Sequence, residues 1–322
     1  MQRPPHYGLG LAALGALVLT PDTLLMRLSQ MDGLAMLVWR ALALGTVFWA
    51  IFLLTSRAPR NLGLLLTRPG LTVIACQSAN AALFSLGISM APVAVVLLAV
   101  ATMPVCAALL SRLLYGEPTR RSTWITMAAV LLGIALAVSG KGGTGHGTTE
   151  ASNTLVGALC GLGVALTLGL SFVTLRHAPR LPLLPAMGSG ALISGLCGLV
   201  LIAPGALTEG HALPILATGL LILPISFFCL SSASRHTAAA NVSLLMLLET
   251  VLGPVWVWAF LPESPSPRML LGGAIVVASL ALYILSTRRR PVSASSLAKY
   301  AGGEAPRAEG AEPPARPPAA RP

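Results

Sequence analysis

The chain has 322 residues, of which 55% are hydrophobic and only 10% charged, and its mean hydropathy is +0.81. A soluble domain carries roughly 25% charged residues, so this composition excludes a soluble fold and indicates a membrane protein. The net charge of +11 is spread over expected loops and a tail and forms no single basic face, so we also reject a nucleic-acid-binding protein.

Ten apolar segments are long enough to cross a bilayer, which requires about 20 helical residues. In chain order, we expect the spans at residues 7–28, 33–54, 70–90, 93–114, 123–139, 154–175, 182–203, 213–231, 237–261 and 268–286. The first span follows Arg3 as a signal peptide would, but nine more follow it, so we interpret it as a retained helix. The predicted fold class is therefore all-α, a polytopic membrane protein with ten transmembrane helices.

Basic residues alternate between the two sets of loops, and cytoplasmic loops are the ones enriched in Lys and Arg. One side of the membrane collects Arg3, Arg57, Arg60, Arg68, Arg112, Arg120, Arg121, Arg176, Arg180, Arg235, Arg288, Arg289 and Arg290. The other side has only Arg27, Lys141 and Arg268. We therefore expect both termini in the cytoplasm, as in an integral protein of a bacterial inner membrane.

An apolar run in the fourth span returns in the ninth. Residues 90–117 and 236–263 align at a constant shift of 146 positions, and the two runs end on Glu117 and Glu263. Inverted repeats of this kind are a common plan of secondary transporters. The sequence therefore predicts two inverted five-helix repeats.

Polar segments mark the limits of these repeats. We expect the first repeat at 1–139 and the second at 154–286, joined by the polar, glycine-rich linker 140–153. Residues 287–322 are rich in Pro, Ala, Arg and Glu and cannot bury a core, so we expect a disordered cytoplasmic tail. The GKGGTG of the linker lacks the residue order of a phosphate-binding loop, so we predict no nucleotide site there.

The sequence carries no pattern of an enzyme or of a metal site. The five cysteines lie inside apolar runs without metal-ligand spacing, so we predict neither a disulfide nor a metal ligand. Motifs such as HExxH and GxSxG are missing. We therefore expect no catalytic residues, no cofactor and no enzyme.

The endings "LLYGE" at 113–117 and "AFLPE" at 259–263, together with two five-helix halves, resemble the drug/metabolite transporter superfamily and its ten-helix EamA-type branch. Pro104 in the fourth span also fits, although its counterpart is Thr250 and the second half has Pro254 instead. The resemblance covers about residues 7–286. It implies a secondary transporter of small organic metabolites such as amino acids, amines or related solutes, often moved outward, by alternating access through a central cavity.

Two ionisable residues in the first two spans are the first site candidates. Asp22 lies about nine residues before the turn near Met31, and Arg40 lies about nine residues after it. At 1.5 Å per residue both lie about 13 Å from the turn, so an ion pair between adjacent helices is expected. The pair belongs either to the wall of a cavity or to a purely structural clamp, and the sequence leaves both readings open.

Glu249 is the candidate in the middle of the ninth span. An ionisable residue at this depth is costly and faces a partner or a water-filled cavity. Five residues later, Pro254 removes a backbone donor and frees a carbonyl group. A carboxyl group there suits proton coupling or recognition of a cationic group, and the alternative is a carboxyl that only holds helices together.

Weaker candidates complete the expected cavity. Gln77 and Asn80 are three residues apart and share a helix face. Asn241 lies eight residues before Glu249, on roughly the same face. Trp256 is a candidate for stacking on an aromatic or cationic substrate, and its alternative is a place in the interfacial aromatic belt.

These observations predict an efflux transporter whose partners are a small-molecule substrate and membrane lipid. Proton coupling and a homodimer stay open, and no nucleic acid is expected. The alternative is a membrane-embedded binding or assembly protein without a transport cycle. In that protein, Asp22, Arg40 and Glu249 would satisfy one another inside a sealed bundle.

Overall fold

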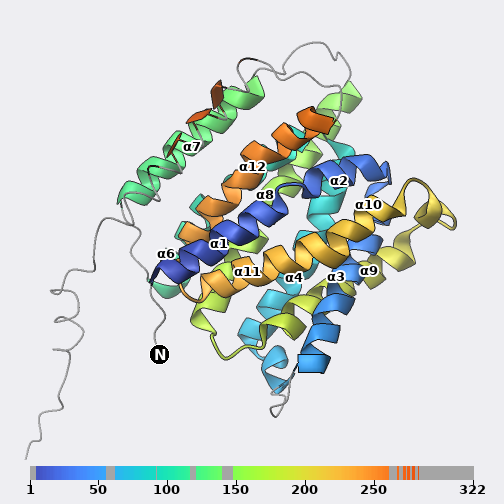
Figure 1. The fold of residues 1–322 in the computed structure, drawn as a ribbon, viewed down its shortest axis with the longest axis horizontal. Coiled ribbons are helices and arrows are strands. Elements are labelled where there is room, and N and C mark those ends of the chain that lie inside the picture. Colours follow the sequence, from blue (N-terminus) through green and yellow to red (C-terminus); the bar gives the residue numbers. More distant parts are fainter. Residues whose placement is uncertain are drawn as a thin grey trace, which may run out of the picture. The chain divides into compact units, whose positions relative to one another are not determined.

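A computed structural model describes residues 5–55, 62–91, 93–116, 121–139 and 148–260, and eight positions between 267 and 282. These residues form helices and no strand (Figure 1). The main helices are α1 (Pro5–Leu19), α2 (Asp22–Ser29), α3 (Gly33–Thr55), α4 (Arg68–Met90), α5 (Val93–Val100), α6 (Met103–Tyr115), α7 (Arg121–Ser139), α8 (Thr148–His177), α9 (Leu183–Leu201), α10 (Ala212–Ala217), α11 (Leu223–Ser234) and α12 (Ala239–Phe260). Short 3₁₀ helices lie at Leu62–Leu66 and Ala206–Thr208, and a π-helical turn lies at Thr218–Ile222.

Six helical segments of the described chain are long and apolar enough to cross a membrane. They are Tyr7–Ser29, Gly33–Thr55, Arg68–Met90, Leu155–His177, Leu183–Leu201 and Ala212–Ser234. Met103–Tyr115 and Ala239–Gly253 are shorter apolar helices. The all-helical, polytopic membrane architecture is as predicted, whereas these segments do not confirm a count of ten, and most of the tenth expected span lies outside the described residues.

Prolines mark interruptions in two expected spans. Thr20 and Pro21 separate α1 from α2 within the first span. Ala101 and Thr102 separate α5 from α6 within the fourth, just before Pro104. A proline lacks the backbone N–H, and its ring clashes with the carbonyl four residues earlier, so a helix bends or ends ahead of it.

The eighth and ninth spans respond to their prolines differently. Between α10 and α11 the chain stays helical but takes a π-helical turn just ahead of Pro224. The helix α12 runs through Pro254 from Ala239 to Phe260 without interruption. The break near the middle of the fourth span therefore has no equivalent in the ninth.

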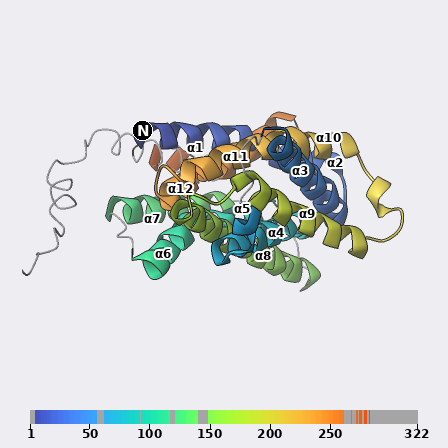
Figure 2. The same cartoon turned by 90° about the horizontal axis from the view of Figure 1, so that it is seen from below.

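The helices pack in matched pairs. Helix α4 of the first half packs on α8 of the second, and the matching contact is that of α11 with α1. Helices α5 and α6 also pack on α8, and the matching contact is that of α12 with α1. Two further contacts, α3 with α9 and α6 with α12, join helices that correspond to each other in the two halves. Figures 1 and 2 both show α1 beside α11 and α12. Each of these contacts therefore joins a helix of the first expected repeat to a helix of the second, and the inversion of the repeats stays a prediction.

The domain limits themselves remain predictions. Helix α8 begins at Thr148, inside the range 140–153 expected as linker, so the last part of that range is helical. Residues 140–147, the tail 287–322, Glu117 and Glu263 lie outside the described residues.

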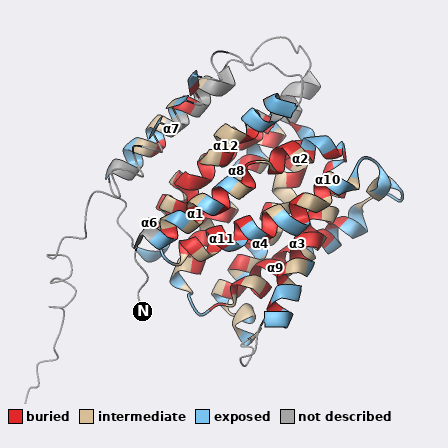
Figure 3. Cartoon of the chain, in the orientation of Figure 1, coloured by how far each residue is buried: buried red, intermediate tan, exposed pale blue. Residues whose placement is uncertain are grey.

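Burial follows the inner faces of the helices (Figure 3). Large side chains that point outward are mostly apolar, such as Leu54, Val200 and Leu213. In water such a surface would be unfavourable, but in a bilayer the hydrocarbon chains cover it, and helices satisfy all backbone groups internally.

Glycines let the inner faces of the helices approach closely, as small residues do between membrane helices. A Cβ atom added at Gly190 of α9 would lie 2.5 Å from the backbone oxygen of Ile74 in α4. At Gly45 of α3 it would lie 2.6 Å from the side chain of Leu192 in α9. These contacts bring α3, α4 and α9 together next to the residues described below.

Candidate functional site

A cavity of about 50 Å³ lies among α1–α5, α8, α11 and α12. This volume is room for a few water molecules. Both halves of the chain line it, and it lies well inside the ends of the membrane-spanning segments. Its position corresponds to the middle of the membrane-spanning part, where transporters usually bind their substrates.

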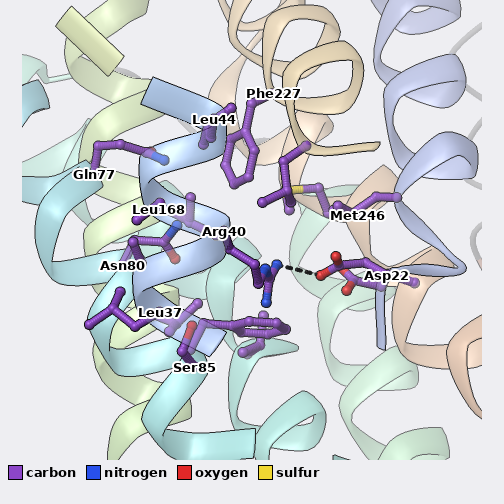
Figure 4. Close-up of a pocket in the computed structure, with 18 residues that line it drawn as sticks. Asp22, Leu37, Arg40, Leu44, Gln77, Asn80, Ser85, Leu168, Phe227 and Met246 are labelled. Atoms are coloured by element: carbon purple, nitrogen blue, oxygen red, sulfur yellow. Dashed lines mark hydrogen bonds and ion pairs between the residues drawn. The ribbon is translucent and has the colours of Figure 1, made fainter. Parts of the chain in front are cut away.

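Five predicted site residues line this cavity: Asp22, Arg40, Gln77, Asn80 and Glu249. Figure 4 shows Asp22, Arg40, Gln77 and Asn80 around it. They come from four helices, α2, α3, α4 and α12, of which α12 is far from the other three in sequence. The structure therefore brings together residues that the sequence selected only for being polar inside apolar spans.

The expected ion pair is confirmed. Nη2 of Arg40 lies 2.6 Å from Oδ2 of Asp22, and both side chains are buried (Figure 4). Arg40 also donates a hydrogen bond to the sulfur of Met26, and its guanidinium carbon lies 5.4 Å from the ring centre of Phe84. The attraction between two buried charges compensates for their loss of hydration only when both are present. The side chains of Asp22 and Arg40 are therefore held next to each other.

The pair is not fully satisfied. Within the described part of the chain, Oδ1 of Asp22 and Nε of Arg40 have no hydrogen-bond partner. Buried polar atoms are almost always paired with protein or with ordered water. A water molecule or a polar solute in the cavity would complete their bonding.

Glu249 is the second carboxyl group of the site. It is buried, at 5% exposure, and it lines the cavity. It is close enough to Asp22 and Arg40 for their charges to act on it. The three groups sum to a charge of −1 when all are ionised and to zero when Glu249 is protonated. The cavity can therefore accept a proton or a cationic group.

The two amides lie on the α4 side of the cavity, as their spacing predicted (Figure 4). Gln77 is buried, and its Oε1 has no partner among the described residues. Asn80 is buried one turn further along the helix. Together they add hydrogen-bonding capacity beside the ion pair.

The structure does not bring Asn241 and Trp256 to this cavity. Asn241 donates to Oγ1 of Thr237 at 3.2 Å. Eight residues place it about 12 Å along α12 from Glu249, and rotated by roughly 80°. Trp256 is 39% exposed and donates to Oγ1 of Thr20 at 2.9 Å, about 10 Å from Glu249 in the other direction.

Sequence reasoning missed the apolar residues of the cavity wall. Those from the second half of the chain are Val164, Leu168, Leu223, Phe227 and Met246. The internal repeat contained a signal for them. At the shift of 146 positions, Asp22 aligns with Leu168, Gln77 with Leu223, Ala81 with Phe227, and Val100 with Met246, and every one of these residues lines the cavity.

The two halves contribute different polar groups to the cavity. The first half supplies Asp22, Arg40 and both amides together with apolar residues such as Leu37 and Phe84, whereas the second half supplies apolar side chains and one carboxyl, Glu249. Such a site can hold both a charged head group and an apolar body.

Comparison with known proteins places this arrangement in a family. The profile of the EamA-like transporter family matches residues 6–139 and 155–285. An uncharacterized transporter of Bacillus subtilis (strain 168), YdfC, is 25% identical over 199 residues, which are 60% of this chain and 62% of that protein's length. The chain thus matches less than two thirds of this relative.

A solved crystal structure shares the fold. Its TM-score is 0.68 at 20% identity, and the likeness covers 89% of this chain and 98% of the other. At this identity the likeness shows the fold alone.

Proposed function

Since the chain belongs to the EamA-like transporter family, we propose that this transporter of small solutes works by alternating access through the cavity around Arg40 and Glu249. Each half of the chain contributes to the cavity wall, so a rocking of one half against the other would expose the cavity to one side of the membrane at a time.

The observation that carries this proposal is a set of buried polar atoms at the cavity that lack a partner among the described residues: Oδ1 of Asp22, Nε of Arg40 and Oε1 of Gln77, beside the carboxyl group of Glu249. A bundle that only holds helices together would satisfy its buried charges within itself. Here three buried polar atoms have no hydrogen-bond partner among the described residues, and a cavity adjoins them. This arrangement supports a transporter over the alternative of a sealed binding or assembly protein.

The chemistry of the cavity favours one class of substrate. The excess of one negative charge favours a solute with a cationic group, such as an amine or an amino acid, and Arg40 supplies a partner for a carboxylate. The apolar part of the cavity wall, with Phe227 and Met246, favours an apolar body. Protonation of Glu249 would neutralise the site and remove its preference for a cation. The cavity would therefore bind a proton and a cationic solute alternately, which would exchange one for the other across the membrane.

The direction of transport follows from the same exchange. With the basic loops and both termini in the cytoplasm of a bacterial inner membrane, an inward proton gradient would drive the cationic solute outward. We therefore propose efflux coupled to protons.

The test is solute flux into proteoliposomes with and without a pH gradient. The panel consists of amino acids, amines and organic anions, and it compares the parent chain with Glu249→Gln. We expect gradient-driven flux of a cationic or zwitterionic solute in the parent and its loss in Glu249→Gln. Glu209→Gln is the matched control, because it makes the same change in an exposed loop, and its flux should equal that of the parent.

Each alternative gives its own result. Flux that stays gradient-dependent in Glu249→Gln would remove Glu249 as the proton carrier and leave the transporter. Flux that ignores the pH gradient in the parent would overturn proton coupling. A parent protein that binds a solute but moves none of the panel would favour the binding protein.

A further inference from the structure

The helix of the first membrane-spanning segment is interrupted immediately before Asp22. Helix α1 ends at Leu19 and α2 begins at Asp22, so Thr20 and Pro21 form the junction. Asp22 is the first residue after it and lines the cavity. The geometry of the junction therefore decides whether this carboxylate faces Arg40.

A hydrogen-bonded chain holds the junction. The indole Nε1 of Trp256 donates to Oγ1 of Thr20 at 2.9 Å, and this hydroxyl donates onward to the backbone oxygen of Leu17 at 2.9 Å. Thr20 is buried at 3% exposure. The hydroxyl group thus accepts a hydrogen bond from α12 and donates one to the last turn of α1.

Close packing supports the same contact one turn earlier on α12. A Cβ atom added at Gly253 would lie 2.9 Å from Oγ1 of Thr23, so a larger residue there would displace α2. Glu249, Gly253 and Trp256 follow one another at spacings of four and three residues, which places them on one face of α12. One helix face therefore carries the carboxyl group at the cavity and the contacts to the junction.

We propose that Trp256 is a positioning residue that holds the α1–α2 junction against α12 and thereby keeps Asp22 on Arg40 and the outer side of the cavity closed. In the expected orientation, α2 and the last turns of α12 lie toward the outside. Movement of α12 away from α2 breaks the Trp256–Thr20 contact and opens the cavity outward. This role rests on the proposed alternating access, but its test needs no substrate.

The experiment measures access to the cavity with a cysteine reporter. The five native cysteines are replaced by alanine, and Ser85→Cys is introduced, since Ser85 lines the cavity and is 2% exposed. A membrane-impermeant maleimide is added to intact cells, and separately to inverted vesicles, and the rate of labelling is measured. Trp256→Phe removes the indole donor and keeps an aromatic ring.

We expect Trp256→Phe to raise the rate of labelling from outside about threefold to tenfold, which corresponds to the loss of one buried hydrogen bond. Thr20→Val should give the same increase, and the double variant no more than either single one. Thr20→Ser retains the hydroxyl group and should react at the parent's rate. The control Trp124→Phe lies on α7, which packs against α5 and α6, and should also match the parent.

Several results would overturn the proposal. One is that Trp256→Phe is labelled at the parent's rate, and another is that Trp124→Phe is labelled as fast as Trp256→Phe. The proposal also fails if the increases of the two single variants add up in the double variant, or if labelling increases only from the cytoplasmic side. Thermal unfolding of each purified variant checks that the chain is folded. If Trp256→Phe fails to fold, the comparison of Thr20→Val with Thr20→Ser decides, because equal rates in these two exclude a role for the hydroxyl group. The labelling rates do not depend on whether solute flux is found. The role of Trp256 and the proposed transport function can therefore be disproved independently of each other.

Discussion

Arg40 and Asp22 lie 2.6 Å apart, Nη2 to Oδ2, on neighbouring helices in the interior of the membrane-spanning part. Each charge is stable there only with its partner, so variants of the pair test how the site is held together. They also distinguish two roles of the pair, as a clamp between α2 and α3 or as part of the cavity wall.

Removing one partner of this pair should destabilise the protein more than removing both. Asp22→Asn removes the carboxylate that is bonded to the buried guanidinium of Arg40 and leaves Glu249 as the other carboxyl group of the cavity, at a cost of about 3–5 kcal/mol for the broken pair. The double variant Asp22→Leu with Arg40→Leu replaces the pair by apolar groups and should recover most of this loss. Thermal unfolding in detergent measures both effects, and a double variant less stable than Asp22→Asn would contradict this account.

Exchanging the two charges separates the clamp from the cavity wall. Asp22→Arg with Arg40→Asp retains an ion pair but moves the positive charge from α3 to α2, away from Phe84 and the amides. We expect folded protein at the parent's yield and a loss of flux of about tenfold or more, because the substrate's partners change places. A swapped chain that both folds and transports as the parent does would assign the pair to structure alone.

The charged residues of the site could be predicted because an ionisable side chain inside a membrane span is energetically costly. Asp22, Arg40 and Glu249 interrupt apolar spans, and an ionisable group there needs a partner or a cavity. Equal depth on adjacent helices then predicted the ion pair. No such signal marks Phe227 or Met246, since an apolar residue in an apolar span is the rule.

Local irregularities limited the rest of the prediction. The junction at Thr20 and the π-helical turn at Thr218–Ile222 change which side chains share a face. Spacing along an ideal helix therefore placed Gln77 and Asn80 correctly on the uninterrupted α4. It did not place Trp256, whose partner Thr20 lies at a break of another helix.

Phe227 should determine the affinity for solutes with an apolar body. Phe227→Ala removes an apolar surface of the cavity, and burial of such a side chain contributes about 1.5–3 kcal/mol. The KM for an apolar amine or amino acid should rise about tenfold or more, with little change for a small polar solute. Phe228→Ala is the matched control, because the neighbouring ring is 46% exposed on the outside of α11. Equal effects in the two variants would remove Phe227 from the binding site.

Packing of α4 against α9 should depend on Gly190. Gly190→Ala brings a methyl group to 2.5 Å from the backbone oxygen of Ile74 and 2.8 Å from Cβ of Gln77. Because the backbone has to move, we expect a loss of about 1–3 kcal/mol and a lower yield of folded protein. Gly10→Ala on α1 meets nothing within 4 Å, so its thermal unfolding should match or exceed that of the parent. A neutral Gly190→Ala would show that α4 and α9 are less tightly packed than described.

Arg235 should stabilise the expected cytoplasmic end of α11 through a contact that its neighbours in the loop lack. Its Nη2 donates to the backbone oxygen of Leu181 at 2.6 Å, and burial lowers the pKa of Arg235 below its ordinary value, a sign that the guanidinium is partly removed from water. Arg235→Ala leaves that oxygen without its donor, at a cost of about 1–2 kcal/mol. Arg180→Ala removes the same charge from an exposed position before α9, and exposed substitutions usually stay within about 0.5 kcal/mol. Thermal unfolding should therefore separate the two variants, and an equal loss in both would assign the effect of Arg235 to the charge of the loop rather than to its bond with Leu181.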